Sequence, residues 1–115
     1  MNFSRFDRKI GSMGMEVPQH TQETLEGYLL RGWEPGGFVT AMLAMDMERA
    51  LATADTANRQ MMWVVGRWII EDAPPESWGS YDQVTNWCKD INGRRTKWAM
   101  WYELNNKEEP QDYSF

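Results

Sequence analysis

The chain has 115 residues, of which 42% are hydrophobic and 13% aromatic, and its 12 basic and 17 acidic side chains give a net charge of −5. This length suits one domain and excludes a two-domain enzyme. Long nucleic acid is bound largely through phosphate contacts to Lys and Arg, so the acidic balance argues against a general DNA- or RNA-binding protein. A single cysteine and a single histidine exclude an internal disulfide and zinc sites built from several such ligands.

No segment approaches the ~20 apolar residues of a membrane helix, and charges stand near the N-terminus where a signal peptide would be apolar. The sequence therefore predicts a soluble, cytoplasmic protein without a membrane partner. Three regions are expected from the distribution of glycine, proline and apolar residues. They are a flexible N-terminal arm (1–18), a helical body (19–92), and a short helix followed by a disordered tail (93–115).

The first two helices are predicted on either side of a Pro-Gly-Gly turn. Apolar spacing around Tyr28 predicts a helix over residues 21–31, with Thr21 as its N-cap and Gly32 as its stop. After the turn, the spacing predicts one helix of roughly four to five turns over residues 38–54.

Two more helices are predicted further along the chain. The third starts at Asp55 or Thr56 and ends before Pro74, and the fourth starts at the capping box opened by Ser80 and ends before Asn92. No segment of comparable length alternates with the period of two that a strand requires. The sequence thus predicts an all-α fold, a compact helical bundle of about four helices.

Seven Trp and nine Met are many for a chain of this size. A small chain has difficulty burying so much apolar surface, and this predicts self-association. The methionines at positions 42, 45, 61 and 62 follow the predicted second and third helices. They are interpreted as core residues or as the seam between subunits.

Signals for catalysis are few. His20 with Glu23 is one general acid–base candidate, but a capping or exposed role at a helix start is favoured. Cys88 falls on the apolar stripe of the fourth helix and is interpreted as a core thiol. We therefore expect no enzyme, no cofactor and no metal site. Two pairs of acids are also present, Asp46 with Glu48 and Glu71 with Asp72. The two members of each pair would face different directions on a helix, so neither pair suggests metal ligands.

Signals for binding are more numerous. Gly36 and Gly37 precede a helix, where free backbone N–H groups favour an anion, although a turn between helices needs glycine for its own geometry. A basic cluster near the C-terminus is either a phosphate site or a solvated charge run. Aromatic residues in or beside loops offer surface for a partner chain or for base stacking. The cluster is Arg94, Arg95 and Lys97, and the aromatic residues are Trp33, Trp78 and Tyr81.

A family resemblance covers about residues 20–88. The string HTQETLEGYLLRGWEPGGFVTAMLAMDMERALATADTANRQ, followed by ESWGSYDQVTNW, is similar to a family of small phage proteins. Its pattern is His-Thr, Leu, Tyr, Arg-Gly, Pro-Gly-Gly-Phe, an alanine-rich helix, Ala-Asp, Asn, and Gly-Ser before a last helix. This pattern resembles the phage anti-CBASS cyclic-oligonucleotide sponges. The resemblance implies a compact helical protein that assembles into hexamers and sequesters the signalling nucleotides of bacterial cGAS-like immunity.

The resemblance also implies site residues. The sponges stack a first-helix tyrosine on a base, and Tyr28 occupies the matching place, although core packing is the alternative because it shares the stripe of the neighbouring leucines. The sponges contact phosphate with a second-helix lysine, and this chain has Ala44 near that position. Arg67, or the basic cluster from Arg94 to Lys97, is the candidate for the missing charge.

The expected ligand-binding residues are therefore Tyr28, Gly36, Gly37 and Arg67. The leading hypothesis is a homo-oligomeric immune-evasion protein in the cytoplasm of the infected bacterial host, which binds cyclic di- or trinucleotides without cleaving them. The alternative is a phage protein that docks on a host or phage protein through exposed aromatic residues.

Overall fold

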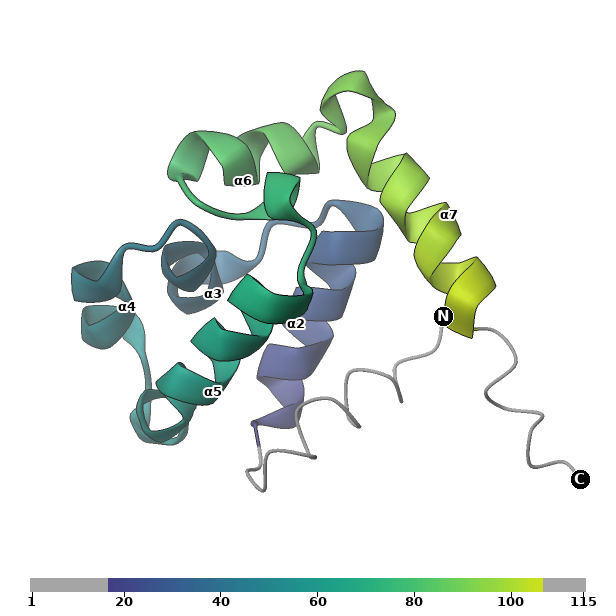
Figure 1. Cartoon of the computed structure of the whole chain (residues 1–115). Helices are drawn as coiled ribbons and strands as arrows, with labels where there is room; N and C mark the ends of the chain where they lie inside the picture. The colour runs from purple at the N-terminus through teal and green to yellow at the C-terminus, as the bar shows by residue number, and fades with distance from the viewer. Residues whose placement is uncertain (1–16, 107–115) are drawn as a thin grey trace, which may run out of the picture.

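The computed structural model describes residues 17–106, and these residues are helical and contain no strand (Figure 1). The all-α prediction is confirmed, but six α-helices stand where about four were predicted. They are α2 (Gln19–Arg31), α3 (Gly36–Leu43), α4 (Met47–Thr53), α5 (Thr56–Asp72), α6 (Tyr81–Cys88) and α7 (Arg94–Asn106), joined in part by the 3₁₀ turns η1 (Pro75–Ser77) and η2 (Ile91–Gly93).

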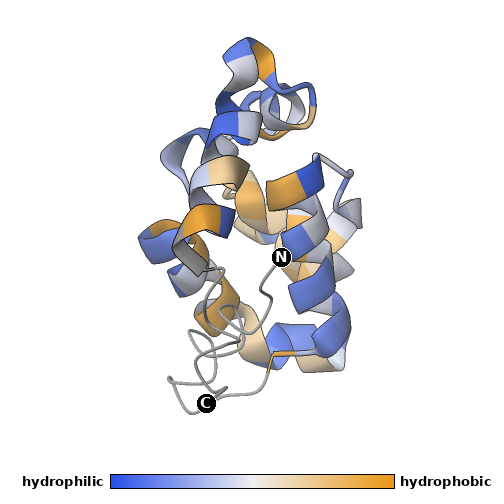
Figure 2. Ribbon diagram, turned by 90° about the vertical axis from the view of Figure 1, so that its right-hand side faces the viewer, coloured by the Kyte–Doolittle hydropathy of each residue, from blue (hydrophilic) through white to orange (hydrophobic). Residues whose placement is uncertain are grey.

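One hydrophobic core lies between these helices. Hydrophobic and hydrophilic stretches alternate along the ribbon, as amphipathic helices require (Figure 2). The predicted stripe of α2 is at the centre of the core, with Leu25, Tyr28 and Leu29 completely buried. Leu43 from α3 and Ile69 from α5 are equally buried, so the core joins elements from the whole described chain.

The start of α2 differs from the prediction. The helix begins at Gln19, and its N-cap is Pro18 rather than Thr21. Thr21 is buried, and its hydroxyl donates to Asn58 Oδ1 over 2.6 Å, which ties the start of α2 to the start of α5. The Thr21 hydroxyl therefore binds a residue distant in the sequence, instead of capping α2 as the local spacing predicted. The predicted stop is confirmed, since Gly32 is left-handed with φ of 73°.

The single helix predicted over residues 38–54 is wrong, because the chain breaks between α3 and α4. Met45 is left-handed with φ of 65°, and the Asp46 N–H donates back to the Ala41 carbonyl. The Asp46 carboxylate then accepts from the Arg49 N–H and caps a new helix. Apolar spacing continues across this turn, so periodicity alone did not reveal it.

The predicted starts of the next two helices are confirmed. Asp55 caps α5 by accepting from the Asn58 N–H, and Ser80 caps α6 by accepting from the Gln83 N–H. α5 ends at Asp72, before the two prolines, as predicted.

The fourth helix ends earlier than predicted, at Cys88 rather than before Asn92. Asp90 and Asn92 are both left-handed, with φ of 57° and 58°, which ends α6 and turns the chain. The Asp90 carboxylate accepts from the Arg95 and Thr96 N–H groups and so starts α7. α7 has 13 residues and is longer than the short helix that was expected.

An aromatic row joins α7 to the body. The Trp98 ring lies 6.2 Å from Trp87 of α6 and is stacked on Tyr102 at 5.1 Å between centroids. The flexible arm and the disordered tail were predicted for segments that lie almost entirely outside the described residues. Val17, assigned to the arm, is a buried core residue.

The left-handed turn predicts an unusual order of stability between two substitutions. A Cβ costs roughly 1–2 kcal/mol in this conformation, whereas glycine normally destabilises a helix by about 0.5–1 kcal/mol relative to alanine. We expect Met45→Gly to be the more stable variant, with a free energy of unfolding about 1 kcal/mol higher than that of Met45→Ala in urea denaturation. Gln60, exposed within α5, is the control position, where alanine should be the more stable. If Met45→Ala is the more stable of the pair, Met45 is not left-handed.

Candidate functional site

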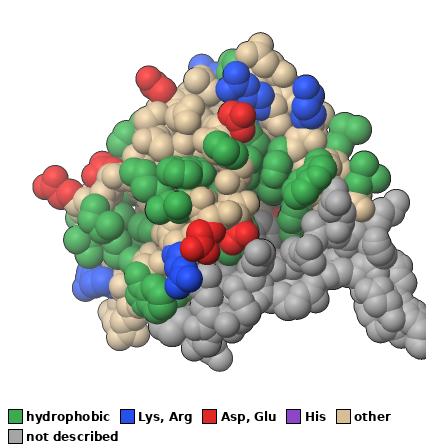
Figure 3. Space-filling view, in the orientation of Figure 1, with side chains coloured by type: hydrophobic (Ala, Val, Ile, Leu, Met, Phe, Trp, Pro, Cys, Tyr) green, Lys and Arg blue, Asp and Glu red, His purple; other side chains and the backbone are tan. Residues whose placement is uncertain are grey.

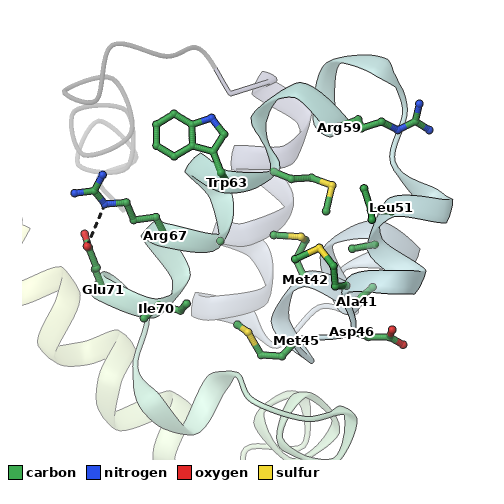
Figure 4. Close-up of a pocket in the computed structure, with 14 residues that line it drawn as sticks. Ala41, Met42, Met45, Asp46, Leu51, Arg59, Trp63, Arg67, Ile70 and Glu71 are labelled. Carbon is green, nitrogen blue, oxygen red and sulfur yellow. Dashed lines mark hydrogen bonds and ion pairs between the residues drawn. The ribbon is translucent and has the colours of Figure 1, made fainter.

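An apolar groove lies between α5 on one side and α3 with α4 on the other. Its volume is about 640 Å³. Figure 4 shows methionine side chains between the two walls, with Trp63 and Ile70 on the α5 side and Leu51 on the α4 side. The lining residues central to this groove are Met42, Met45, Met47, Leu51, Trp63 and Ile70.

Large apolar side chains of the groove are open to solvent. Met47 is 60% exposed, Ile70 55% and Trp63 54%. In Figure 3 hydrophobic side chains gather over the α4 and α5 side of the molecule and again over α7. A soluble chain seldom leaves so many large apolar side chains together on one face without a use for them. Gly66 also lines the groove, close to Met42, since a Cβ there would lie 3.3 Å from Met42 Cε.

The charges of the groove lie at its edges and have partners within the chain. Arg67 donates to Glu71 over 3.1 Å, the dashed contact in Figure 4. Arg59 donates to the Ala54 carbonyl, and the Asp46 carboxylate accepts from the Tyr81 hydroxyl. The floor of the groove is thus apolar, and its charged groups lie at the edges.

A second, more polar pocket of about 430 Å³ lies at the start of α3. Gly36, with φ of 80°, and Gly37 line it together with two cations, Arg49 and Lys89. Apart from the adjoining backbone and the two neighbouring residues, no atom lies within 4 Å of the place where a Gly36 Cβ would stand, so there is space for a ligand beside this backbone. Glu34 also lines the pocket and reduces its positive charge.

A polar cluster connects the two sites. The Tyr81 hydroxyl donates to Asp46, and Arg49 donates to the same hydroxyl over 3.1 Å. The hydrogen bond from Tyr81, followed by that from the Arg49 backbone, holds the pKa of the Asp46 carboxyl below its usual value. Asp46, the N-cap of α4, lines the apolar groove, and Arg49 of α4 lines the polar pocket, so the start of this helix contributes to both sites.

The surroundings of Cys88 do not favour its reactive thiolate form. Cys88 is partly buried beside the polar pocket, and burial, then the charge of Glu34, raises the pKa of its thiol. A raised pKa keeps the sulfur protonated and weakly nucleophilic at neutral pH. His20 is exposed, and Glu23 accepts instead from the Gln19 side chain. Within residues 17–106, no three His, Cys, Asp or Glu side chains gather as metal ligands.

The predicted ligand-binding residues do not come together. Tyr28 has no exposed surface, and its hydroxyl donates to the Ser77 carbonyl over 2.7 Å. This geometry corrects the expectation that Tyr28 stacks on a base, because the ring packs in the core. Gly36 and Gly37 line the polar pocket, whereas Arg67 lies on the apolar groove. Ala44 is buried at the end of α3.

Of the three aromatic residues expected at the surface, two are exposed and one is partly buried. Trp33 is 62% exposed and lies against Arg31 of α2, whose guanidinium is 5.1 Å from the ring centre. Tyr81 is exposed, whereas Trp78 is partly buried against the core. Trp63, which the sequence analysis did not single out, is exposed and lines the groove.

Comparisons with protein-family models, curated proteins and solved structures find no match to this chain. The resemblance to the cyclic-oligonucleotide sponges therefore stays a prediction. Among the helices of the described residues, none combines the length and apolar character needed to cross a membrane.

The buried position of Tyr28 predicts a loss of stability on substitution. Tyr28→Phe removes the donor to Ser77 and should lower the free energy of unfolding by about 1–3 kcal/mol, as for a buried acceptor left unpaired. Tyr28→Ala should cost roughly 3–5 kcal/mol. Urea denaturation measures both, with Tyr81→Phe as an exposed control that should cost less. A Tyr28→Phe protein as stable as the parent would contradict the buried hydrogen bond.

Proposed function

We propose that this protein acts by binding and that its apolar groove holds the apolar face of an amphipathic helix from another protein chain. The observation that carries the proposal is the open groove, with Met47, Trp63 and Ile70 each more than half exposed. Its length runs along α5 between two helical walls, a shape that suits a helix lying in a groove.

The chemistry of the lining favours this kind of ligand. Methionine side chains are flexible and polarisable, so they adapt to different apolar partners. Trp63 supplies a large anchor of the type that dominates binding energy at protein interfaces. The charges of Arg67 and Glu71 lie at the edge, where they contribute to orientation more than to affinity.

A model peptide tests the groove directly. The probe is a fluorescein-labelled 18-residue helix of Leu, Ala, Lys and Glu, with Leu at positions i, i+3, i+4 and i+7. We expect saturable binding by fluorescence anisotropy, and we expect Ile70→Glu to weaken it at least about tenfold, because a buried apolar contact is lost and a charge enters the groove.

Two controls separate groove binding from general adhesion. Ile91 is 41% exposed in η2, away from the groove, so Ile91→Glu should bind the peptide like the parent. A scrambled peptide of the same composition should bind weakly. Equal affinity of the parent and Ile70→Glu for the helical peptide would reject the proposal.

A second candidate function is the sequestration of cyclic di- or trinucleotides by a phage immune-evasion protein. One arrangement supports it: the two predicted glycines, Gly36 and Gly37, share the polar pocket with Arg49 and Lys89. Backbone N–H groups beside glycine and nearby cations are suited to phosphate. The buried ring of Tyr28 supplies no stacking surface, so this function needs another aromatic partner for the base.

Calorimetry with cyclic di- and trinucleotides tests this second function. Saturable binding is expected, and Lys89→Gln should weaken it about tenfold, the effect of one charged hydrogen bond of roughly 1.5 kcal/mol. Lys97→Gln, outside the pocket, should have no effect. Recovery of intact nucleotide after heat denaturation would distinguish sequestration from hydrolysis. The absence of binding to any cyclic nucleotide in the panel would reject the sponge.

A further inference from the structure

A second apolar surface lies on α7. The inner side of this helix packs on α2 and α6, while Met100 and Leu104 on its outer side are 62% and 63% exposed. These two residues are four positions apart, so they lie on one face of the helix. α7 thus has the form of the ligand for which the groove is suited, an amphipathic helix with an open apolar face.

The outer face of α7 does not reach the groove of its own chain. α7 packs on α2, α6 and η2, on the side of the molecule opposite α4 (Figure 1). A contact between the two surfaces therefore requires a second copy of the chain. We propose that the groove of one copy receives the outer face of α7 from another copy, an inference that rests on the proposed helix-binding function of the groove.

The charges of the two helices favour one orientation. Along α5 the groove has Arg59 near its first end and Glu71 at its last end. Along α7 the order is the same, with Arg94 and Lys97 early and Glu103 late. Antiparallel packing of the two helices then brings Lys97 of α7 to the Glu71 end of the groove, whereas parallel packing would bring Lys97 toward Arg59, a like charge.

The spacing along the two helices agrees with this orientation. If Lys97 lies beside Glu71, then Leu104 is about 10.5 Å further along α7, at a rise of 1.5 Å per residue. Trp63 lies about 12 Å back along α5 from Glu71 by the same measure. Leu104 therefore meets the exposed ring of Trp63 when the charges are paired.

This contact joins two different surfaces, so it is head-to-tail. Each copy still has a free groove or a free α7 after the first contact, and the assembly closes into a ring or extends. A variant that is blocked at the groove still has an intact α7, and a variant that is blocked at α7 still has an intact groove. Two such variants can therefore bind each other although neither can bind itself. Ile70→Glu blocks the groove, and Leu104→Glu blocks α7.

Light scattering of the full-length protein tests the contact. The parent should have a mass well above the 13.5 kDa of one chain, and each blocked variant alone should be a monomer. A mixture of the two variants should form a complex of twice the chain mass and no larger, because one intact groove meets one intact α7. Ile91→Glu is the control and should assemble like the parent.

Three results would overturn the proposal. They are a monomeric parent at the highest attainable concentration, blocked variants that assemble like the parent, and a mixture that forms no complex. The pairing of Lys97 with Glu71 has its own test: Lys97→Glu should weaken assembly severalfold, and Glu71→Lys in the same chain should restore it. Failure of that rescue would overturn the antiparallel register.

The model peptide distinguishes this proposal from the function on which it rests. Leu104→Glu leaves the groove empty, so it should bind the amphipathic peptide at least as tightly as the parent does. A monomeric parent that binds the peptide would retain the helix-binding function and reject a second copy as the partner. A monomeric parent that does not bind the peptide would reject both.

Discussion

The arrangement of the helices depends on the contacts of one residue, Trp87. Its ring, nearly inaccessible to solvent, lies between Tyr28 of α2 and Trp98 of α7, at 6.5 and 6.2 Å between ring centres. The indole N–H donates to the Leu29 carbonyl, and the Trp87 carbonyl accepts from the Arg95 side chain. One residue of α6 therefore positions α2 on one side and α7 on the other, through both its ring and its backbone.

The two candidate sites depend on a different feature, the break between α3 and α4. A continuous helix over these residues would have run past α5 as one rod. The left-handed Met45 and the cap at Asp46 instead turn α4, so that Met47 and Leu51 face α5 across the groove. The same turn carries Arg49 to the polar pocket. The end of α3 thus shapes both the apolar groove and the polar pocket.

Local rules predicted the parts of the fold that local chemistry decides. The all-α class, the stop at Gly32, and the caps at Asp55 and Ser80 follow from periodicity and capping, and the structure has all four. The sequence did not reveal where Thr21 would find its partner, because Asn58 is 37 residues away. The turn at Met45 was not predicted either, because methionine rarely adopts a left-handed conformation and so gives no sequence signal for one.

The sites were less predictable than the fold. The glycines at the start of α3 were found because glycine carries a local backbone signal, and they do line a pocket. Tyr28 was a core residue by periodicity and a ligand residue by resemblance, and its burial agrees with the periodicity. Trp63 was missed because α5 is apolar around much of its circumference, and periodicity does not say which part of such a helix the core covers.

The close approach between Gly32 and α7 has a consequence for the cover of the core. A Cβ on Gly32 would lie 2.6 Å from Arg95 Nε, so the guanidinium lies directly against the backbone at the end of α2. The same Nε donates to the Trp87 carbonyl, so Arg95 joins the start of α7 to α6 as well. A side chain at position 32 would displace Arg95 and would add the strain of a left-handed residue with φ of 73°. Displacement of α7 would in turn uncover the ring of Trp87, against which Trp98 packs.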